Sequence, residues 1–411
     1  MCVKMTWLKS APPWCAAVVV LLAAGCGSAH SPAAPAAPAA AAAAAVHTSK
    51  PIWLQSLQMT SASAGWALYN PASPANPSVN PPVLIARTTN GARMWTDVTP
   101  AAARPLLATP NAGEVLDAVD GQHAYLAVTG SAQESVSAGS TTLVFSTDDG
   151  GRTWTKSARL RTTGLASLLS FADDQHGWLV VDEGAAMGRD AVQMYRTADG
   201  GRHWSLAGGI PVSCDKRGVT LATAKTGWLT SVCVVGLGGE LLVSHDGGAS
   251  WAPHPLPVSA SICDGGGCTL TGPQLAGGEA FLTVAAVGGK PALLVSRDLG
   301  QAWTALSLPA RAGMYPRIKF FGGSAGVLVA AGAQGALGNV FYTTADGGRT
   351  WRPVRQGTHF TQLGAAIDFV SLRTGFAWIT GGDATSGSAP KMYVTGNSGR
   401  TWTAFAPRLA R

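Results

Sequence analysis

The sequence predicts an all-β fold, a seven-bladed β-propeller whose blades are four-stranded antiparallel sheets. One eight-residue pattern occurs seven times, and its copies end at Trp95, Trp154, Trp204, Trp251, Trp303, Trp351 and Trp402. The spacing of about 50 residues suits four short strands and their turns, and it is too long for a leucine-rich or ankyrin unit. The 51 glycines and the charged fraction of only 12% also fit short strands joined by glycine turns, with almost no helix.

Each copy has the residues of a tight turn between two strands, as in Thr344–Trp351 (TADGGRTW). A Ser or Thr hydroxyl and an acidic side chain can hydrogen-bond to the turn backbone, and the glycines permit positive φ. The closing Trp brings a large apolar ring between neighbouring sheets, and its indole N–H needs a partner. The third position of the turn is predicted to be structural and holds Asn90, Asp149, Asp199, Asp246, Asp298, Asp346 and Asn397.

A second pattern precedes each turn by about half a repeat. It is clearest at Gly65-Trp66, Gly177-Trp178, Gly227-Trp228 and Gly375-Phe376. Weaker versions stand at Ala124-Tyr125, Ala280-Phe281 and Gly326-Val327. We therefore expect every repeat to place an aromatic or branched side chain on an equivalent strand.

The turn pattern Ser/Thr-x-Asp-x-Gly-x-Thr-Trp resembles the Asp-box, or BNR, repeat. Together with the Gly-Trp strand it resembles the photosystem II assembly factor group of propellers, and the scaffold is similar to that of sialidases. The resemblance extends from about Pro51 to the C-terminus. It implies a role in assembling an envelope protein complex. It implies no activity, since sialidases, xyloglucanases and sortilin-type receptors use the box as scaffolding.

The N-terminus resembles a bacterial lipoprotein signal. Lys4 and Lys9 precede an apolar run from Ala16 to Ala24, and Cys26 follows as the expected acceptor of the lipid. An ordinary secretory signal with an incidental cysteine is the alternative. We expect residues 1–25 to be the signal, 26–50 an Ala- and Pro-rich tether, and 51–411 the propeller. The protein is then lipid-anchored in the bacterial cell envelope, on the extracytoplasmic side of the membrane.

Four cysteines remain after the signal and Cys26, namely Cys214, Cys233, Cys263 and Cys268. We favour the local disulfides Cys214–Cys233 and Cys263–Cys268 over a four-cysteine metal site, because neither pair has the two-residue spacing of a zinc knuckle. No cofactor or metal is expected.

The formal charge of +7 falls to +5 once Lys4 and Lys9 leave with the signal. General solubility explains this charge better than affinity for anionic lipid or cell-wall polymers, and no motif suggests nucleic acid.

The candidate ligand site is a ring of polar residues on the first strand of each repeat, which is expected to be innermost. Aligned on the Gly-Trp pattern, with a one-residue adjustment at Gln274, the ring contains Gln58, Asp117, Ser170, Thr220, Gln274, Lys319 and Asp368, and Arg317 points the same way. The competing interpretation is that any propeller channel is wet, so that polar residues there need no function.

No catalytic residues are assigned. The sialidase arginine cluster and Tyr-Glu pair are not recognisable, and the nearest string to their aromatic-Arg-Ile-Pro phrase, residues 315–319, has the wrong order. The favoured function is a non-enzymatic scaffold that binds an envelope protein or protein complex through loops on a rigid disc. The alternative is a glycan-binding or sialidase-like glycoside hydrolase, in which Asp117 and Asp368 would supply the carboxylates.

Overall fold

The computed structural model describes residues 49–71, 82–109, 112–130, 140–186, 189–211, 215–232, 239–258, 268–286, 290–313, 316–330, 340–357, 365–379 and 391–410. The chain divides into two compact units, Met1–Val46 and His47–Arg411, and every described residue belongs to the second. The described residues are almost all in strands and turns. Their one helix is α1 (Arg104–Leu107), so the expected scarcity of helix is confirmed.

The first sheet contains both ends of the described chain. Its strands lie in the order β1-β31-β5-β4-β3-β2. They are β1 (Ser49–Pro51), β31 (Arg408–Ala410), β5 (Met94–Asp97), β4 (Leu84–Thr88), β3 (Gly65–Asn70) and β2 (Trp53–Met59). β1 pairs with β31 in antiparallel fashion and β31 pairs with β5 in parallel. Ser49 and Lys50 pair with Ala410 and Leu409 in this sheet.

The next two sheets follow in chain order. The second has the order β10-β8-β7-β6, with β9 on β8. It consists of β6 (Gly113–Ala118), β7 (Ala124–Gly130), β8 (Ser140–Thr147), β9 (Thr155–Lys156) and β10 (Leu160–Thr162). The third has the order of the chain and consists of β11 (Leu165–Phe171), β12 (Gly177–Ala186), β13 (Arg189–Thr197) and β14 (Ser205–Leu206).

The fourth sheet joins two antiparallel meanders. One consists of β15 (Asp215–Leu221), β16 (Gly227–Val232), β17 (Leu241–Ser244) and β18 (Ala252–Pro253). The other consists of β19 (Cys268–Ala276), β20 (Glu279–Ala286), β21 (Ala292–Ser296) and β22 (Thr304–Ser307). A single residue pair, Val232 with Thr269, connects them. Cys268 is disulfide-bonded, and the other six cysteines lie outside the described residues, as do the two expected pairings.

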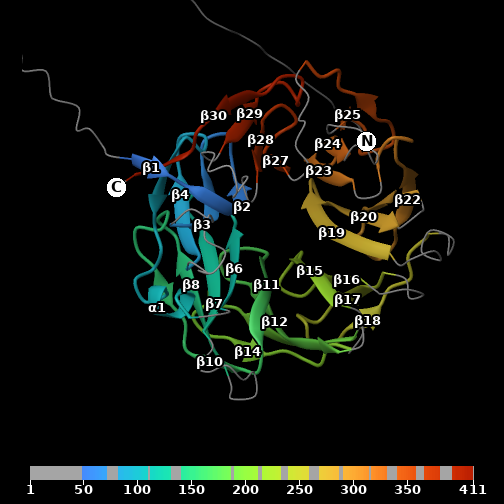
Figure 1. The fold of residues 1–411 in the computed structure, drawn as a ribbon. Helices are drawn as coiled ribbons and strands as arrows, with labels where there is room; N and C mark the ends of the chain where they lie inside the picture. Colours follow the sequence, from blue (N-terminus) through green and yellow to red (C-terminus); the bar gives the residue numbers. More distant parts are fainter. Residues whose placement is uncertain are drawn as a thin grey trace, which may run out of the picture. The chain divides into compact units, whose positions relative to one another are not determined.

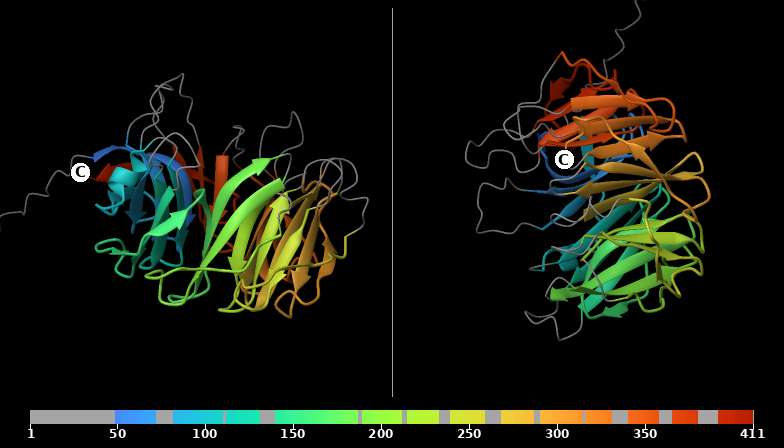
Figure 2. Two further views of the ribbon diagram at one scale, coloured as in Figure 1. Left: turned by 90° about the horizontal axis from the view of Figure 1, so that it is seen from below. Right: turned by 90° about the vertical axis from the view of Figure 1, so that its right-hand side faces the viewer.

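The last two sheets again follow the chain. They consist of β23 (Arg317–Phe321), β24 (Ala325–Ala330), β25 (Val340–Thr344) and β26 (Arg352–Pro353), and of β27 (Ala365–Phe369), β28 (Gly375–Ile379), β29 (Met392–Thr395) and β30 (Thr403–Phe405). In Figure 1 the first strands, β2, β6, β11, β15, β19, β23 and β27, surround a common centre. Figure 2 shows the curled sheets standing side by side around it. This arrangement is a β-propeller.

The core lies between neighbouring sheets and is built from the two repeated aromatic positions. Trp66, Trp178 and Trp228 on the second strands are fully buried. Each meets the closing Trp of the next repeat edge to face, with centroid distances of 6.1 Å from Trp66 to Trp154, 5.2 Å from Trp178 to Trp251 and 6.5 Å from Trp228 to Trp303. The predicted packing of the turn Trp between sheets is confirmed.

The turns have the expected hydrogen bonds, and residues 344–351 show the pattern. Asp346 Oδ1 accepts from the Thr344 hydroxyl at 2.7 Å and from Thr350 N at 2.9 Å, while Thr344 Oγ1 accepts from Gly348 N at 3.0 Å. The other six copies make the same three bonds. The bond from the Thr350 hydroxyl is the main cause that lowers the pKa of Asp346 to about 2. These short local bonds fix each turn.

Only some of the indole N–H groups of the closing Trp residues have a hydrogen-bond acceptor. Trp95, Trp204 and Trp402 donate to a carbonyl of their own turn, and Trp154 donates to Val98 O. Within the described residues the Nε1 atoms of Trp251, Trp303 and Trp351 have no partner. Packing of the rings, rather than their hydrogen bonds, is therefore the common feature of the copies.

Leu299 occupies a turn position that five of the other six copies give to glycine. Its φ is +55°, in the left-handed region, and its side chain is 37% exposed. We expect Leu299→Gly to raise the free energy of unfolding by about 0.5–1 kcal/mol, because relief of the strain exceeds the entropy that glycine adds to the unfolded chain. The reverse change Gly347→Leu, at φ +71°, is the matched control and should destabilise. Urea unfolding followed by Trp fluorescence measures both, and a destabilised Leu299→Gly would contradict the assignment of strain.

Candidate functional site

The polar ring occupies one equivalent position in every repeat. Each ring residue on a first strand pairs across the sheet with the aromatic position of the second strand. These pairs are Gln58 with Trp66, Asp117 with Tyr125, Ser170 with Trp178, Thr220 with Trp228, Gln274 with Phe281, Lys319 with Val327 and Asp368 with Phe376. The adjustment at Gln274 is needed because its turn is one residue shorter.

Two glutamines in the ring join neighbouring sheets as amide bridges. Gln58 Nε2 donates to Leu116 O at 2.7 Å, and Gln58 Oε1 accepts from Ala118 N at 2.9 Å. Gln274 does the same with one residue, donating to Phe320 O at 2.9 Å and accepting from Phe320 N at 3.0 Å. Each primary amide thus satisfies a donor and an acceptor on the exposed edge of the next first strand.

Three further side chains each make a single hydrogen bond to the next sheet or, for Thr220, to the next meander of the fourth sheet. Asp117 Oδ2 accepts from Phe171 N at 2.8 Å, and Ser170 Oγ accepts from Leu221 N at 3.1 Å. Thr220 Oγ1 donates to Pro273 O at 2.7 Å. The side chains therefore reach sideways to the next sheet, always in the same direction around the centre.

The last link is an ion pair. Lys319 Nζ lies 2.5 Å from Asp368 Oδ1, and the two side chains are 40% and 19% exposed. β27, which carries Asp368, lies beside β2, so the series returns to the first sheet (Figure 1). Arg317 differs from the other ring candidates, because it is exposed and has no hydrogen bond or ion pair among the described residues. Ligand binding by these eight residues stays a prediction, and seven of them hold the sheets together.

Two acidic groups on β6 hold protons more tightly than usual. Burial raises the pKa of Glu114 to about 7. Burial also raises the pKa of Asp117 to about 6, against the opposing effect of the bond from Phe171 N. The Glu114 carboxyl group makes no hydrogen bond within the described residues, although its backbone is paired with Val128 of β7. Sequence reasoning did not select Glu114, since the burial that raises its pKa is a property of the folded chain.

These pKa values predict how stability depends on pH. The folded state binds the Asp117 proton more tightly than the unfolded state does, whose pKa is near 3.8, so this group destabilises the fold as pH rises from about 4 to 7. We expect Asp117→Asn to raise the free energy of unfolding by about 1–2 kcal/mol at pH 7.5 and by little at pH 4. Urea unfolding across this range measures the effect, with the exposed Asp148→Asn as control. A gain that is equal at both pH values would contradict the assignment.

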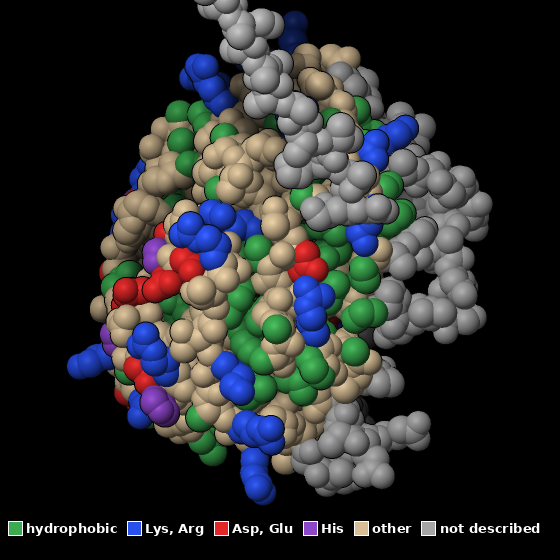
Figure 3. All heavy atoms as spheres, turned by 90° about the vertical axis from the view of Figure 1, so that its left-hand side faces the viewer, with side chains coloured by type: hydrophobic (Ala, Val, Ile, Leu, Met, Phe, Trp, Pro, Cys, Tyr) green, Lys and Arg blue, Asp and Glu red, His purple; other side chains and the backbone are tan. Residues whose placement is uncertain are grey.

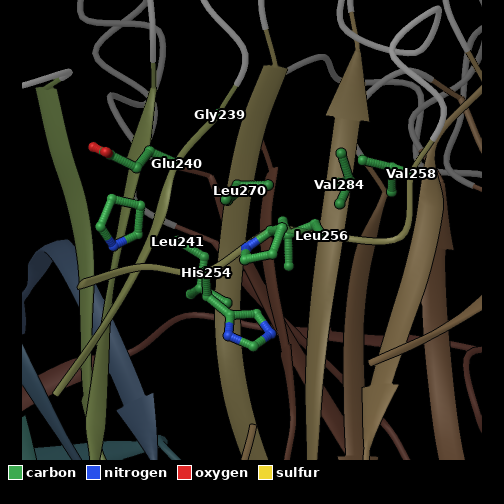
Figure 4. A pocket seen from close by; sticks show the side chains of 10 residues that line it. Gly239, Glu240, Leu241, His254, Leu256, Val258, Leu270 and Val284 are labelled. Atoms are coloured by element: carbon green, nitrogen blue, oxygen red, sulfur yellow. The ribbon is translucent and has the colours of Figure 1, made fainter. Parts of the chain in front are cut away.

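A pocket of about 350 Å³ in the fourth sheet is lined by residues of both meanders, from β17 and β18 and from β19 and β20. Figure 4 shows Leu256 and Val258, from the segment after β18, near Leu270 of β19 and Val284 of β20. His254 and Glu240 add polar groups at its border. Its lining suits a small apolar group. Sequence reasoning missed it, although the alternating prolines of residues 253–257 were a signal for an extended segment that packs over strands.

The described residues contain no cluster of His, Cys, Asp or Glu able to hold a metal ion. No described helix is long and apolar enough to cross a membrane.

The comparisons with known proteins give structural similarity alone, since no protein-family profile and no curated protein matches the sequence. Similar solved structures include YCF48 bound to a D1 peptide, at 16% identity over 87% of this chain and 91% of that chain, with a TM-score of 0.47. A GH74 xyloglucanase from Xanthomonas campestris is 16% identical over 87% of this chain and 54% of that chain, with a TM-score of 0.47.

A prolyl endopeptidase structure is 9% identical over 88% of this chain and 50% of that chain, with a TM-score of 0.54. The chain thus spans about half the length of the xyloglucanase and of the endopeptidase. The likeness to the endopeptidase shows the fold and says nothing of activity. A fold of this kind does not by itself decide between binding and catalysis.

Proposed function

We propose that this chain is a lipid-anchored, seven-bladed Asp-box propeller on the extracytoplasmic side of a bacterial membrane, which binds an envelope protein or protein complex without catalysis. Seven turns with one hydrogen-bond pattern support the blade count. So does the fourth sheet, whose two meanders are joined by the single pair Val232 and Thr269 and count as two blades.

The observation that carries the proposal is the series of inter-sheet bonds in the polar ring. A glycosidase needs two carboxyl groups that face one substrate. Here Asp117 is bonded to β11 through Phe171 N, and Asp368 is paired with Lys319 of β23. The ring residues use their polar groups to fix the scaffold, which supports a rigid binding platform.

The proposed binding face is the end of the sheets opposite the repeat turns. There the second strands end, for example at Asn70, Gly130 and Val232, and the third strands begin. The long connections between these strands include residues 69–82, 129–140 and 381–391, most of which lie outside the described residues. Residues 182–190 do not form such a connection, because β12 extends to Ala186 and β13 begins at Arg189. Connections of this length on a fixed scaffold are where binding residues usually occur.

The anchor is proposed from the sequence around Cys26. The Ala- and Pro-rich composition of residues 26–50 suits a tether between this anchor and the folded domain. A protein anchored on the extracytoplasmic side of the membrane would meet proteins of the envelope, and we propose one of these as its partner. Cell-surface glycans are the other class of ligand at that location.

A glycoside hydrolase is the second candidate, and one observation favours it. Glu114 has a pKa of about 7, which suits an acid catalyst near neutral pH. It would act without Asp117, because residues three apart on β6 point to opposite faces of the sheet. The test is turnover of xyloglucan, cell-wall glycans and sialylated glycans by the parent protein, Glu114→Gln and Asp117→Asn. The binding proposal predicts no saturable turnover by any of the three. Saturable turnover by the parent that is lost in Glu114→Gln would replace it with the hydrolase.

A further inference from the structure

Positive charge is concentrated in the last quarter of the chain. Residues 309–411 contain eleven Lys and Arg against three Asp, whereas residues 1–308 contain 18 basic and 19 acidic residues. On the side shown in Figure 3, Lys and Arg side chains are spread over the described surface, and Asp, Glu and His gather mainly along one edge. The net charge of the protein is therefore a property of its last two sheets and their surroundings.

Six exposed arginines form a connected strip, called here the arginine strip: Arg93, Arg352, Arg355, Arg373, Arg400 and Arg408. Backbone hydrogen bonds connect the segments that carry them. Gly357 N donates to Arg400 O at 2.8 Å, Ser398 N to Arg373 O at 2.9 Å, and Arg408 N to Arg93 O at 3.0 Å. The strip thus crosses from β26 over the turns of β27–β30 to the turn between β4 and β5.

The two repeat turns within the strip lack the carboxylate that the other five have. Asn90 and Asn397 stand in its place, and the turns keep their hydrogen bonds: Met94 N to Asn90 Oδ1 and Thr401 N to Asn397 Oδ1 are both 2.9 Å. Neutral amides at these positions preserve the turn and remove two negative charges. None of the six guanidinium groups forms an ion pair within the described residues.

The strip also adjoins the point where the chain enters the fold. β1 pairs with β31 so that Pro51 lies opposite Arg408, and Lys50 adds another positive charge. The residues before β1 include the proposed tether. If that tether holds the protein near the membrane, the end of the strip at Lys50 and Arg408 is the part that meets the membrane.

We propose that the arginine strip binds the surface of an anionic lipid bilayer and orients the propeller with its repeat turns toward the membrane. The orientation rests on the lipid anchor of the proposed function, whereas the affinity does not. Each Lys or Arg close to an anionic bilayer adds roughly 1 kcal/mol, and a lipid chain with a basic patch anchors more firmly than the chain alone. The opposite face then remains available to a partner.

The test is vesicle binding by the processed chain with Cys26→Ala, so that no attached lipid contributes. We expect binding to phosphatidylcholine vesicles that contain phosphatidylglycerol, weakening as salt rises. Arg373→Gln with Arg400→Gln should lower the partition coefficient about thirtyfold. Arg152→Gln with Arg202→Gln is the matched control, since these turn arginines donate to the carbonyls of Asp149 and Asp199 beside their carboxylates. The control pair should bind like the parent.

Equal binding to vesicles with and without phosphatidylglycerol would overturn the proposal, as would equal loss in both double variants. Binding to a soluble acidic polysaccharide but not to the vesicles would assign the strip to a polymer instead. Thermal melting of each variant confirms that it is folded. Because the protein under test carries no lipid, a negative result leaves the anchor unaffected, and the anchor is tested separately by the mass of the native protein.

Discussion

Replacing Trp66 by alanine should lower the free energy of unfolding by about 3–5 kcal/mol. Trp66 is fully buried on β3, and its ring meets Trp154 edge to face at 6.1 Å. Its Nε1 donates to Asp120 O at 2.8 Å, and Arg87 lies over its ring at 5.8 Å. Alanine therefore leaves a cavity between two sheets and removes the contacts that join them.

Trp66→Phe separates these effects, because it keeps an aromatic ring and loses the indole N–H. A smaller loss of about 1–2 kcal/mol is expected for it. Leu206→Ala, at a side chain that is 62% exposed, should change stability by less than about 0.5 kcal/mol. Urea unfolding gives all three values. A loss for Trp66→Ala no larger than that for Leu206→Ala would contradict the packing of second-strand aromatics as the main connection between sheets.

Replacing Cys26 by alanine should move the protein from the membrane fraction to the soluble extracytoplasmic fraction. Without the thiol no lipid can be attached, and residues 16–24 are too short an apolar run to span a membrane comfortably. Fractionation of cells followed by immunoblotting measures the change. The arginine strip alone should keep only a small fraction of the variant on the membrane, and high salt should release that fraction.

Cys2→Ala and Cys15→Ala are the matched controls, since both residues precede the expected processing site and should leave the protein in the membrane fraction. The intact mass of the native protein supplies an independent measurement. A native protein without lipid, or a Cys26→Ala variant that stays in the membrane at high salt, would favour the ordinary secretory signal.

The repeat turns could be predicted from sequence because their hydrogen bonds are local. Thr344, Asp346 and Gly348 lie within five residues of one another, so their types alone specify the turn. The packing of the turn Trp between sheets, as at Trp154, was also predicted, since this position recurs with the repeat. Register along the first strands followed from the same alignment.

The direction of the ring side chains was not predictable. Ser170 and Thr220 sit where the sequence places them, but a residue on an innermost strand can face either the channel or the next sheet. Which way the side chain points depends on the twist between neighbouring sheets, and this twist cannot be predicted from the sequence. The arginine strip joins residues more than 300 positions apart, Arg93 and Arg408, and became visible only when β31 paired with β5. Asn90 and Asn397 were a signal for it that the sequence already contained.

The central claim, binding of an envelope partner by an anchored propeller, is tested most directly by affinity purification of the tagged native protein from gently solubilised membranes. Mass spectrometry then identifies whatever is bound in stoichiometric amount. The claim predicts one enriched envelope protein or complex, absent from a parallel purification of an unrelated tagged lipoprotein. No stoichiometric partner, together with glycan turnover that depends on Glu114, would contradict it.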